Sequence, residues 1–501
     1  MYLGIDLGTG SVKVLLLSEA GGVVKESSRP YGVDSRYPGR AETDPELWWA
    51  ATVSAVLEVV GGHAPQVRAI GLSGQMHSLV LCDASGQPLR PAMLWADTRS
   101  SECLTVYQRL NERSRARLGN PIVAGMTGPA LLWVSAHEPA IYRSARHALL
   151  PKDWLRLRLT AEIATDPSDA SATLLYSLET QSWDLELLET LELRPDLLPP
   201  ILPSSAVSGL LAREAALELG LPAGLPVACG AGDTAAALLG GGLLGENLSG
   251  SSAVQLTVGS GAQLVAQSAQ PRPHPRLETH CYRTAAPEGQ GSPWYAMAAL
   301  QNAGLALEFA RRTLGLSWEA AYQEAFSVSS SEGALFLPYL SGERTPVLDA
   351  SARGAWVGLG LNHTPGHLMR ASFEGVALSI RRGLEALREV GIQPDTLRVA
   401  GGGTLEPRWR QLLSDALNLP LYGVEVSSVS ARGAALLAAQ MMGIEPGTGA
   451  LPLEVASPQR ESRDALEQVY SQFLTLYPRL QGLGKAPRDA LPPKAAPQFG
   501  P

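Results

Sequence analysis

The sequence predicts an α/β protein built from two related domains. With 501 residues, the chain is longer than one hydrophobic core usually serves. Two pairs of β-prone runs, each joined by a glycine-rich tip, lie about half a chain apart, at residues 2–17 and 253–264. Buried-strand patterns alternate with helical patterns elsewhere in the chain. A repeated hairpin of this kind is typical of a duplicated domain, and we expect the two tips to face each other.

The first hairpin contains a candidate phosphate site. Its strands, residues 2–6 and 13–17, are joined by the residues LGTGS, and a tip of small residues exposes several backbone N–H groups that can bind an anion. Asp6 lies just before this tip, where an acid beside a phosphate suggests a Mg²⁺ ligand that acts through water. An ordinary hairpin turn explains the same residues, because GxGS alone is a weak pattern.

A second candidate site follows the strand predicted at residues 67–72, after a helix predicted at residues 42–60. This strand ends in SGQMHS, and ligands usually bind at strand ends in α/β sheets. Gln75 and His77 offer hydrogen bonds, and Met76 offers an adaptable apolar surface. A lone histidine is more often a satisfied structural residue, so both interpretations stay open.

The segment MLWADTRS, residues 93–100, is predicted to be extended. Trp95, Asp97 and Arg99 alternate along it, so all three could point to one face. A tryptophan face beside an aspartate is a common way to hold a sugar. It is also common at the edge of a hydrophobic core.

The stretch LPVACGAGDTAAALLGGG, residues 225–242, contains the candidate catalytic group. A short apolar strand at residues 226–229 leads through two glycines to Asp233, and a run of small residues follows. A carboxylate with little solvent around it could take the proton of a substrate hydroxyl. The alternative is that Asp233 caps a helix at residues 234–239. Its place shortly before the second tip, where it could meet the last phosphate of a nucleotide held between the tips, favours the functional interpretation.

The C-terminal part predicts helices at residues 302–314, 371–390 and 431–442, and a strand at residues 335–340. A buried strand at residues 397–400 precedes Gly401, Gly402 and Gly403, and a helix at residues 407–417 follows. This order suits the close approach of a flat ring or a phosphate, although three glycines could also form a bare turn. Beyond Gly484 the chain is rich in proline, and we expect it to be disordered.

Composition narrows the class of protein. Hydrophobic residues make up 45% and charged residues 18%, as in a soluble globular enzyme. A net charge of −8 argues against nucleic acid or an anionic membrane as a partner. The four cysteines are scattered without a CxxC pair, which indicates reduced thiols. No signal-peptide pattern and no apolar run of about 18 residues occurs, so we expect a cytoplasmic protein.

Together these stretches resemble the FGGY carbohydrate kinases. The similarity covers about residues 1–445 in unbroken order and rests on GIDLGTG (4–10), SGQMHS (73–78), LWADTR (94–99), LLPKDWLRLRLT (149–160), TDPSDAS (165–171), GAGDT (230–234), FLPYLSGERTP (336–346) and AGGGTLEPRWRQLLSD (400–415). Several motifs in one order are far more specific than any one of them. The residues QMH, in place of an Arg-Glu pair, separate the xylulose branch of this family from the glycerol branch.

The resemblance implies two ribonuclease-H-like domains of the actin-like ATPase type, with ATP and Mg²⁺ in a deep cleft between them. It implies ATP-dependent phosphorylation of D-xylulose to D-xylulose 5-phosphate, with Asp233 as the general base. It assigns the sugar to Gln75, Met76, His77, Trp95, Asp97, Asp233 and Thr234. It assigns the nucleotide to Gly8, Thr9, Gly10, Ser11, Lys13, Gly259, Ser260, Gly401, Gly402 and Gly403. It assigns the metal to Asp6 and Asp233.

The expected domains are a sugar-binding domain at residues 1–245, a nucleotide-binding domain at 246–445, a helical extension at 446–484 and a disordered tail at 485–501. The expected partners are a ketose and ATP, and the chain is compatible with a homodimer.

Four departures from the family pattern put the exact sugar in doubt. Thr234 follows the candidate base, Gly261 ends the second tip, Ser78 ends SGQMHS, and residues 127–131 lack the usual lysine. The substrate could therefore be another ketose or polyol, such as ribulose. A non-catalytic sugar sensor and an actin-like chaperone or filament protein are further alternatives. The retained Asp6 and Asp233 count against a sensor. A filament protein would have no use for the QMH residues at the strand end.

Overall fold

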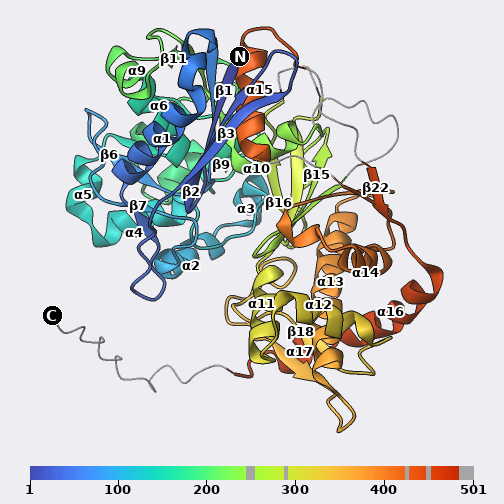
Figure 1. Ribbon diagram of the computed structural model, residues 1–501. Helices are drawn as coiled ribbons and strands as arrows, with labels where there is room; N and C mark the ends of the chain where they lie inside the picture. The colour runs from blue at the N-terminus through green and yellow to red at the C-terminus, as the bar shows by residue number, and fades with distance from the viewer. Residues whose placement is uncertain (244–253, 287–290, 424–427, 447–452, 485–501) are drawn as a thin grey trace, which may run out of the picture.

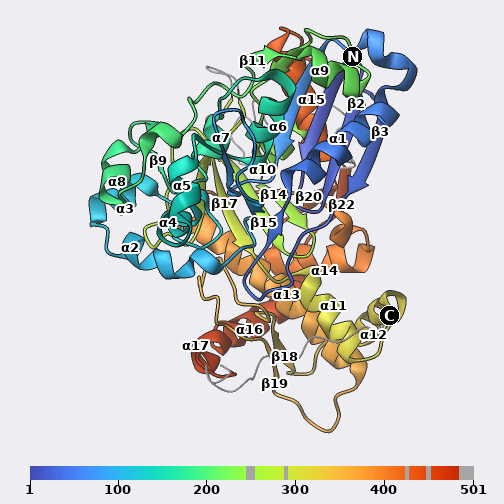
Figure 2. The same cartoon turned by 90° about the vertical axis from the view of Figure 1, so that its left-hand side faces the viewer.

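The computed structural model describes residues 1–243, 254–286, 291–423, 428–446 and 453–484. Figures 1 and 2 show two lobes, one formed mainly by the N-terminal half of the chain and the other mainly by the C-terminal half. Each lobe contains one large mixed sheet with helices packed on it. The tail predicted to be disordered, residues 485–501, lies outside the described residues.

The first sheet has the order β11-β12-β5-β1-β2-β3. Its strands are β1 (Tyr2–Leu7), β2 (Ser11–Leu17), β3 (Val23–Pro30), β5 (Ala69–Gly74), β11 (Val207–Leu210) and β12 (Pro226–Ala228). β1 pairs antiparallel with β2 and parallel with β5, so the first hairpin tip and the end of the QMH strand lie at the same edge of the sheet. The predicted hairpin and strand are therefore confirmed.

The second sheet repeats this plan in the order β16-β17-β15-β14-β20-β21-β22. Its strands are β14 (Val254–Val258), β15 (Ala262–Ser268), β16 (His280–Arg283), β17 (Trp294–Leu300), β20 (Leu397–Ala400), β21 (Leu421–Gly423) and β22 (Leu453–Ala456). β14 pairs antiparallel with β15 and parallel with β20, as β1 does with β2 and β5. The predicted duplication is confirmed in the topology of the two sheets.

Helix starts follow local capping chemistry. α1 (Pro45–Val60) begins after Asp44, whose Oδ1 accepts from the N–H of Glu46 at 3.0 Å. The two residues before Asp44, predicted as helical, instead form β4 (Glu42–Thr43). α13 (Pro365–Glu389) begins earlier than predicted, because Thr364 and His367 form a capping box.

The remaining elements surround these two sheets. The other strands are β6 (Val80–Cys82), β7 (Ala92–Met93), β8 (His147–Leu149), β9 (Tyr176–Ser177), β10 (Ser182–Trp183), β13 (Ala231–Gly232), β18 (Leu335–Leu337) and β19 (Ala355–Val357). The other helices are α2 (Leu104–Gln108), α3 (Glu112–Leu118), α4 (Thr127–His137), α5 (Pro139–Ser144), α6 (Pro151–Thr160), α7 (Pro167–Ala170), α8 (Leu185–Thr190), α9 (Arg213–Leu219), α10 (Asp233–Gly240), α11 (Gly304–Thr313), α12 (Trp318–Ser327), α14 (Pro407–Leu417), α15 (Val429–Met441), α16 (Arg460–Phe473) and α17 (Leu476–Leu480). Short 3-10 helices span Gly61–Gln66, Arg99–Cys103, Pro195–Leu197 and Gly402–Thr404. No helix of the described residues is long and apolar enough to cross a membrane.

Helix α15 comes from the C-terminal part of the chain but packs on the first lobe, beside β1 and α10 (Figure 1). Glycines make this contact possible. A Cβ atom on Gly71 would lie 1.8 Å from the carbonyl oxygen of Ala434, and one on Gly433 would lie 1.9 Å from that of Ala236. Because α15 touches both β1 and α10, it fixes the element that carries Asp233 against the strand that carries Asp6.

Gly433→Ala tests this close contact. The added Cβ meets backbone of α10 rather than a movable side chain, so we expect the free energy of unfolding to fall by about 1–3 kcal/mol. Thermal unfolding followed by circular dichroism measures the loss. Gly62→Ala is the matched control, because a Cβ there meets nothing within 4 Å. Equal stability of the two variants would contradict the packing described.

Candidate active site

Asp6 lies at the carboxyl end of β1, beside the first glycine tip. It is 8% exposed, and its Oδ1 accepts a hydrogen bond from Ser73 Oγ of the neighbouring strand at 3.0 Å. The tip closes with a bond from the Gly8 N–H to the Ser11 carbonyl at 3.1 Å. Gln75 supports the tip, since its Nε2 donates to the Gly8 carbonyl at 3.3 Å. Gln75, predicted as a sugar contact, is thus 1% exposed and bound to the hairpin.

Asp233 is the first residue of α10, and the cap position belongs to Gly232. The alternative in which Asp233 caps this helix is therefore wrong. Its Oδ1 accepts from Thr234 Oγ1 at 3.2 Å. Burial, and then the charge of Asp6, raise the pKa of Asp233 to about 7. A carboxyl group with this pKa can accept a proton near neutral pH.

The two carboxylates fit a divalent cation. Within the described residues, neither Asp6 nor Asp233 forms an ion pair with a cationic side chain, and each is desolvated. Lys13, which was predicted to bind the nucleotide, is exposed on β2. It acts on Asp6 only through its charge. Two carboxylates beside the first glycine tip offer the oxygen ligands that Mg²⁺ prefers.

The second tip lies against the three glycines. β14 ends at Val258, and the Gly259 N–H donates to the Gly261 carbonyl at 2.8 Å. A Cβ on Gly401, which has φ +93°, would lie 2.6 Å from the Val258 carbonyl oxygen. Only glycine allows this approach, so the tip and residues 401–403 form one exposed backbone surface. Ser260 is also exposed on it.

His77 has a backbone conformation that is rare for a side chain of its kind, with φ +72°. Its Nδ1–H donates to the Ala172 carbonyl at 2.7 Å, which leaves Nε2 as an acceptor. Burial lowers the pKa of His77 to about 4, so the imidazole is neutral at physiological pH. A strained, neutral histidine at a strand end is typical of a ligand-binding position.

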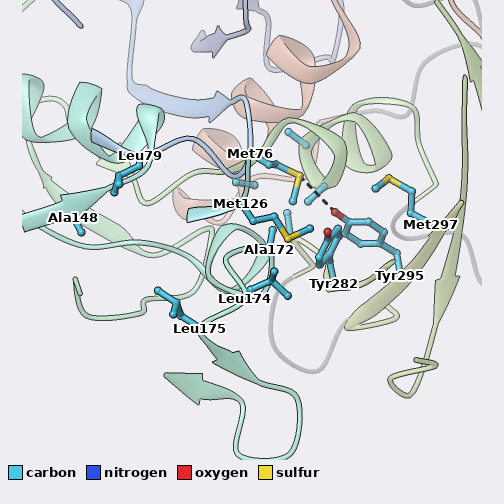
Figure 3. Close-up of a cluster of buried hydrophobic side chains, with 14 of the residues drawn as sticks. Met76, Leu79, Met126, Ala148, Ala172, Leu174, Leu175, Tyr282, Tyr295 and Met297 are labelled. Atoms are coloured by element: carbon cyan, nitrogen blue, oxygen red, sulfur yellow. Dashed lines mark hydrogen bonds between the residues drawn. The ribbon is translucent and has the colours of Figure 1, made fainter. Parts of the chain in front are cut away.

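The second lobe contributes aromatic residues to the same place. Tyr282 of β16 contacts the His77 ring with a centroid separation of 5.9 Å, and its hydroxyl lies 2.6 Å from Nδ1 of His280. The Tyr295 hydroxyl of β17 lies 3.8 Å from Sδ of Met76. Figure 3 shows Met76, Tyr282 and Tyr295 converging. Our sequence reasoning missed these aromatic residues, because neither β16 nor β17 was predicted.

The segment with Trp95 and Asp97 does not present a single ligand face. Trp95 is 36% exposed, and its Nε1–H donates to Thr9 Oγ1 of the first tip at 2.8 Å. Asp97 is 1% exposed; its Oδ2 accepts from the Ala41 N–H at 2.8 Å and from Arg99 at 2.7 Å. Trp95 thus stays beside the site, whereas the Asp97 carboxylate is engaged within the first lobe.

A buried charge cluster lies beneath the turn that leads to Asp233. Lys152 Nζ is 2.6 Å from Asp153, 3.0 Å from Asp166 and 2.9 Å from Asp169, and all four side chains are fully buried. Ser168 Oγ accepts from the Gly232 N–H at 2.9 Å and donates to Asp166 at 2.6 Å. The motifs PKDW and TDPSDAS, to which the sequence reasoning gave no role, therefore hold the backbone just before the candidate base.

The fold and this site define a two-lobed α/β protein in which two acidic side chains lie beside a glycine-rich turn, an arrangement suited to phosphoryl transfer. The chain belongs to the FGGY family of carbohydrate kinases. The family's N-terminal domain matches residues 1–240, and its C-terminal domain matches residues 255–442. A carbohydrate kinase uses a sugar and ATP as substrates, and the predicted two-domain α/β fold class is confirmed.

Curated relatives and solved structures agree with this assignment. A protein named xylulose kinase from Escherichia coli (strain K12) is 36% identical over 420 residues, which cover 83% of this chain and 84% of the relative. One from Bacillus subtilis (strain 168) is 33% identical, with 87% of each chain covered. The crystal structure of "a xyloylose kinase from Brucella ovis" has a TM-score of 0.87 at 34% identity and covers 96% of this chain and 99% of its own.

Asp233→Asn tests the raised pKa of Asp233. Its pKa of about 7 in the folded chain exceeds the usual value of 3.8, so the folded state holds a proton that the unfolded state has lost between these values. The free energy of unfolding therefore falls as pH rises from about 4 to about 7. Asparagine cannot ionise, so Asp233→Asn removes this pH-dependent loss of stability. We expect the Tm of the variant to exceed that of the natural chain by several degrees at pH 8 and by much less at pH 5.

The measurement is a thermal scan at both pH values without divalent cations. Asp83→Asn is a control of opposite sign, because hydrogen bonds from Ser85 and Gln87 lower the pKa of the half-buried Asp83. If the gain from Asp233→Asn were the same at pH 5 and pH 8, the raised pKa would be wrong.

Proposed function

We propose that this chain transfers the terminal phosphoryl group of ATP to the 5-hydroxyl of D-xylulose, giving D-xylulose 5-phosphate. The observation that carries the proposal is the desolvated Asp233 carboxylate, which forms no ion pair with any of the described residues and lies at the edge where the first glycine tip and the QMH strand end meet. Relatives named xylulose kinase that match over most of the chain support the choice of sugar.

Asp233 acts as the general base. Its pKa of about 7 gives the carboxylate enough affinity for a proton while about half of it is ionised at neutral pH. Thr234 Oγ1 donates to Oδ1, which leaves Oδ2 for the sugar hydroxyl. The hydrogen bond from the Gly232 N–H to Ser168 Oγ holds the turn in place, so that the oxygen of the sugar hydroxyl meets the phosphorus in line.

The phosphates lie against the backbone of the two tips, residues 8–11 and 259–260, in which the Gly8 and Gly259 N–H groups already bind carbonyls of their own tip. Lys13 adds positive charge on β2, and residues 401–403 lie along the adenosine. Asp6 and Asp233 would hold Mg²⁺, which would neutralise negative charge on the phosphates. Correct positioning and charge balance account for most of the rate enhancement in such transfers.

Two of the four departures from the family pattern, Ser78 and Gly261, have local structural causes, so they do not argue against xylulose as the sugar. Ser78 is 1% exposed; its hydroxyl donates to Gln75 at 3.3 Å and accepts from the Trp95 N–H at 3.1 Å. A Cβ on Gly261 would lie 2.4 Å from the Leu300 carbonyl oxygen, so glycine is required there for packing. Neither residue is placed to select a sugar.

The remaining assignments belong to the same proposal. Residues 1–245 bind mainly the sugar, residues 246–445 mainly the nucleotide, and residues 446–484 extend the second lobe. The protein works in the cytoplasm and is compatible with a homodimer.

Asp233→Ala tests the role of the base. Because removal of a general base typically costs roughly 10²–10⁴-fold, we expect kcat to fall by that factor while binding of an ATP analogue persists. A coupled assay of ADP release measures kcat, and calorimetry measures nucleotide binding. Asp83→Asn, on an exposed turn, should keep full activity. Undiminished turnover by Asp233→Ala would exclude the role.

A substrate panel tests the sugar. We expect kcat/KM for D-xylulose to exceed that for D-ribulose, L-ribulose, pentitols and glycerol by at least roughly tenfold, since a mispositioned hydroxyl loses alignment with the phosphate. A higher value for a ribulose or a pentitol would replace D-xylulose with that substrate. Sugar binding with no ADP release from any of them would favour the sensor.

A further inference from the structure

Arg344 lies in the SGERTP segment of the second lobe, between β18 and β19, and its backbone is firmly held on both sides. Before it, the Glu343 carboxylate accepts from the Gln301 N–H at 2.5 Å and from the Arg344 N–H at 2.8 Å. After it, the Thr345 N–H donates to the Ala299 carbonyl at 3.0 Å, and Thr345 Oγ1 donates to the Glu278 carbonyl at 2.8 Å. These hydrogen bonds hold the segment against β17 and its C-terminal end, so the Arg344 side chain starts from a fixed position.

The Arg344 side chain reaches the first lobe. Its Cζ lies 5.2 Å from the ring centroid of Trp95, within the range of a cation–π contact. Trp95 in turn donates to Thr9 of the first glycine tip. One guanidinium from the second lobe thus lies beside the strand-end and tip residues that form the site on the first lobe.

In the described part of the chain no carboxylate is bound to this guanidinium, and Glu343 acts on it only through its charge. Within the described residues it forms no hydrogen bond or ion pair, although it is only partly exposed. Arg99, by contrast, contacts Asp97 at 2.7 Å and Glu42 at 2.9 Å. Leaving a desolvated charge and its five N–H donors unpaired is costly, so an acceptor from outside the chain is the natural partner.

Besides the Glu343 carboxylate, which acts on Arg344 through its charge, the groups around Arg344 are neutral histidines and aromatic rings. Burial, with a further contribution from the charge of Arg344, lowers the pKa of both His77 and His280. The His77 Nε2 is therefore an acceptor, whereas Arg344 offers donors only. A ligand that fits both must accept hydrogen bonds on one side and donate one on the other.

We propose that Arg344 recognises the ketone end of the sugar: its planar guanidinium donates to the carbonyl oxygen at C2 and to the adjacent hydroxyl oxygen at C1, while His77 Nε2 accepts from a hydroxyl. This inference rests on the proposed function, because it places the ketone end away from Asp233, which takes the proton at the other end. The two coplanar oxygens of a hydroxyketone match the fork of a guanidinium, and the staggered oxygens of a polyol do not.

Arg344→Met tests the proposal, with Arg344→Lys as the conservative variant and Arg353→Met as the matched control. Arg353 is an exposed arginine of the same region that binds backbone carbonyls only, as at Ala352. Calorimetry measures the Kd of D-xylulose and of xylitol, its polyol analogue, for each folded variant, and the coupled assay measures KM for ATP. Circular dichroism confirms folding.

A hydrogen bond to a charged group is worth about 1.5–3 kcal/mol, which corresponds to a roughly 10- to 150-fold change in Kd. We expect Arg344→Met to weaken D-xylulose binding by this factor and xylitol binding by much less, with KM for ATP unchanged. Arg344→Lys should recover part of the loss, and Arg353→Met should match the natural chain.

Equal losses for D-xylulose and xylitol would overturn the proposal, as would no loss, or a natural chain that binds the two equally well. If Arg344→Met does not fold, the same comparison with Arg344→Lys tests the proposal. A lysine lacks the planar fork of a guanidinium, so it should reduce the ratio of the xylitol Kd to the D-xylulose Kd. Failure of the natural chain to phosphorylate D-xylulose would instead reject the proposed function itself.

Discussion

Two carboxylates, Asp6 and Asp233, are held close enough that the charge of Asp6 raises the pKa of Asp233, and within the residues that the structure describes neither has a cationic side chain bound to it. Such an arrangement costs free energy in the folded protein, because desolvation and repulsion both favour the neutral form. A fold maintains it only if the surrounding contacts determine the position of both groups. In the first lobe, backbone packing and buried hydrogen bonds fix the positions of Asp6 and Asp233.

The support for Asp233 comes from contacts that leave little freedom. The turn before it is bound to Ser168, which belongs to a fully buried cluster around Lys152. Its helix is pressed against α15 through Gly433, and α15 is pressed against the strand of Asp6 through Gly4. A buried ion cluster and backbone-to-backbone packing are both stiff, since neither tolerates a shift without leaving a charge unpaired or atoms overlapping.

The two lobes meet at the end of the QMH strand. The first lobe contributes Met76 and His77, and the second contributes Tyr282 and Tyr295 against them. Any change in the angle between the lobes would therefore alter the contacts of these side chains, to which the proposed function assigns the sugar. This coupling gives a physical reason for a kinase of this form to join sugar binding to the exclusion of water from ATP.

The sequence by itself determined the parts whose signals are local. Both glycine-tipped hairpins, the strand before SGQMHS, β20 and α14 follow from apolar periodicity and turn residues, and GAGDT marked the candidate base. Only the tertiary structure decided that Asp233 is not a helix cap, that Asp97 pairs with Arg99, and that Arg344 lies over Trp95. The partner of a charged or aromatic side chain is set by segments distant in sequence, so no periodicity within one segment carries that information.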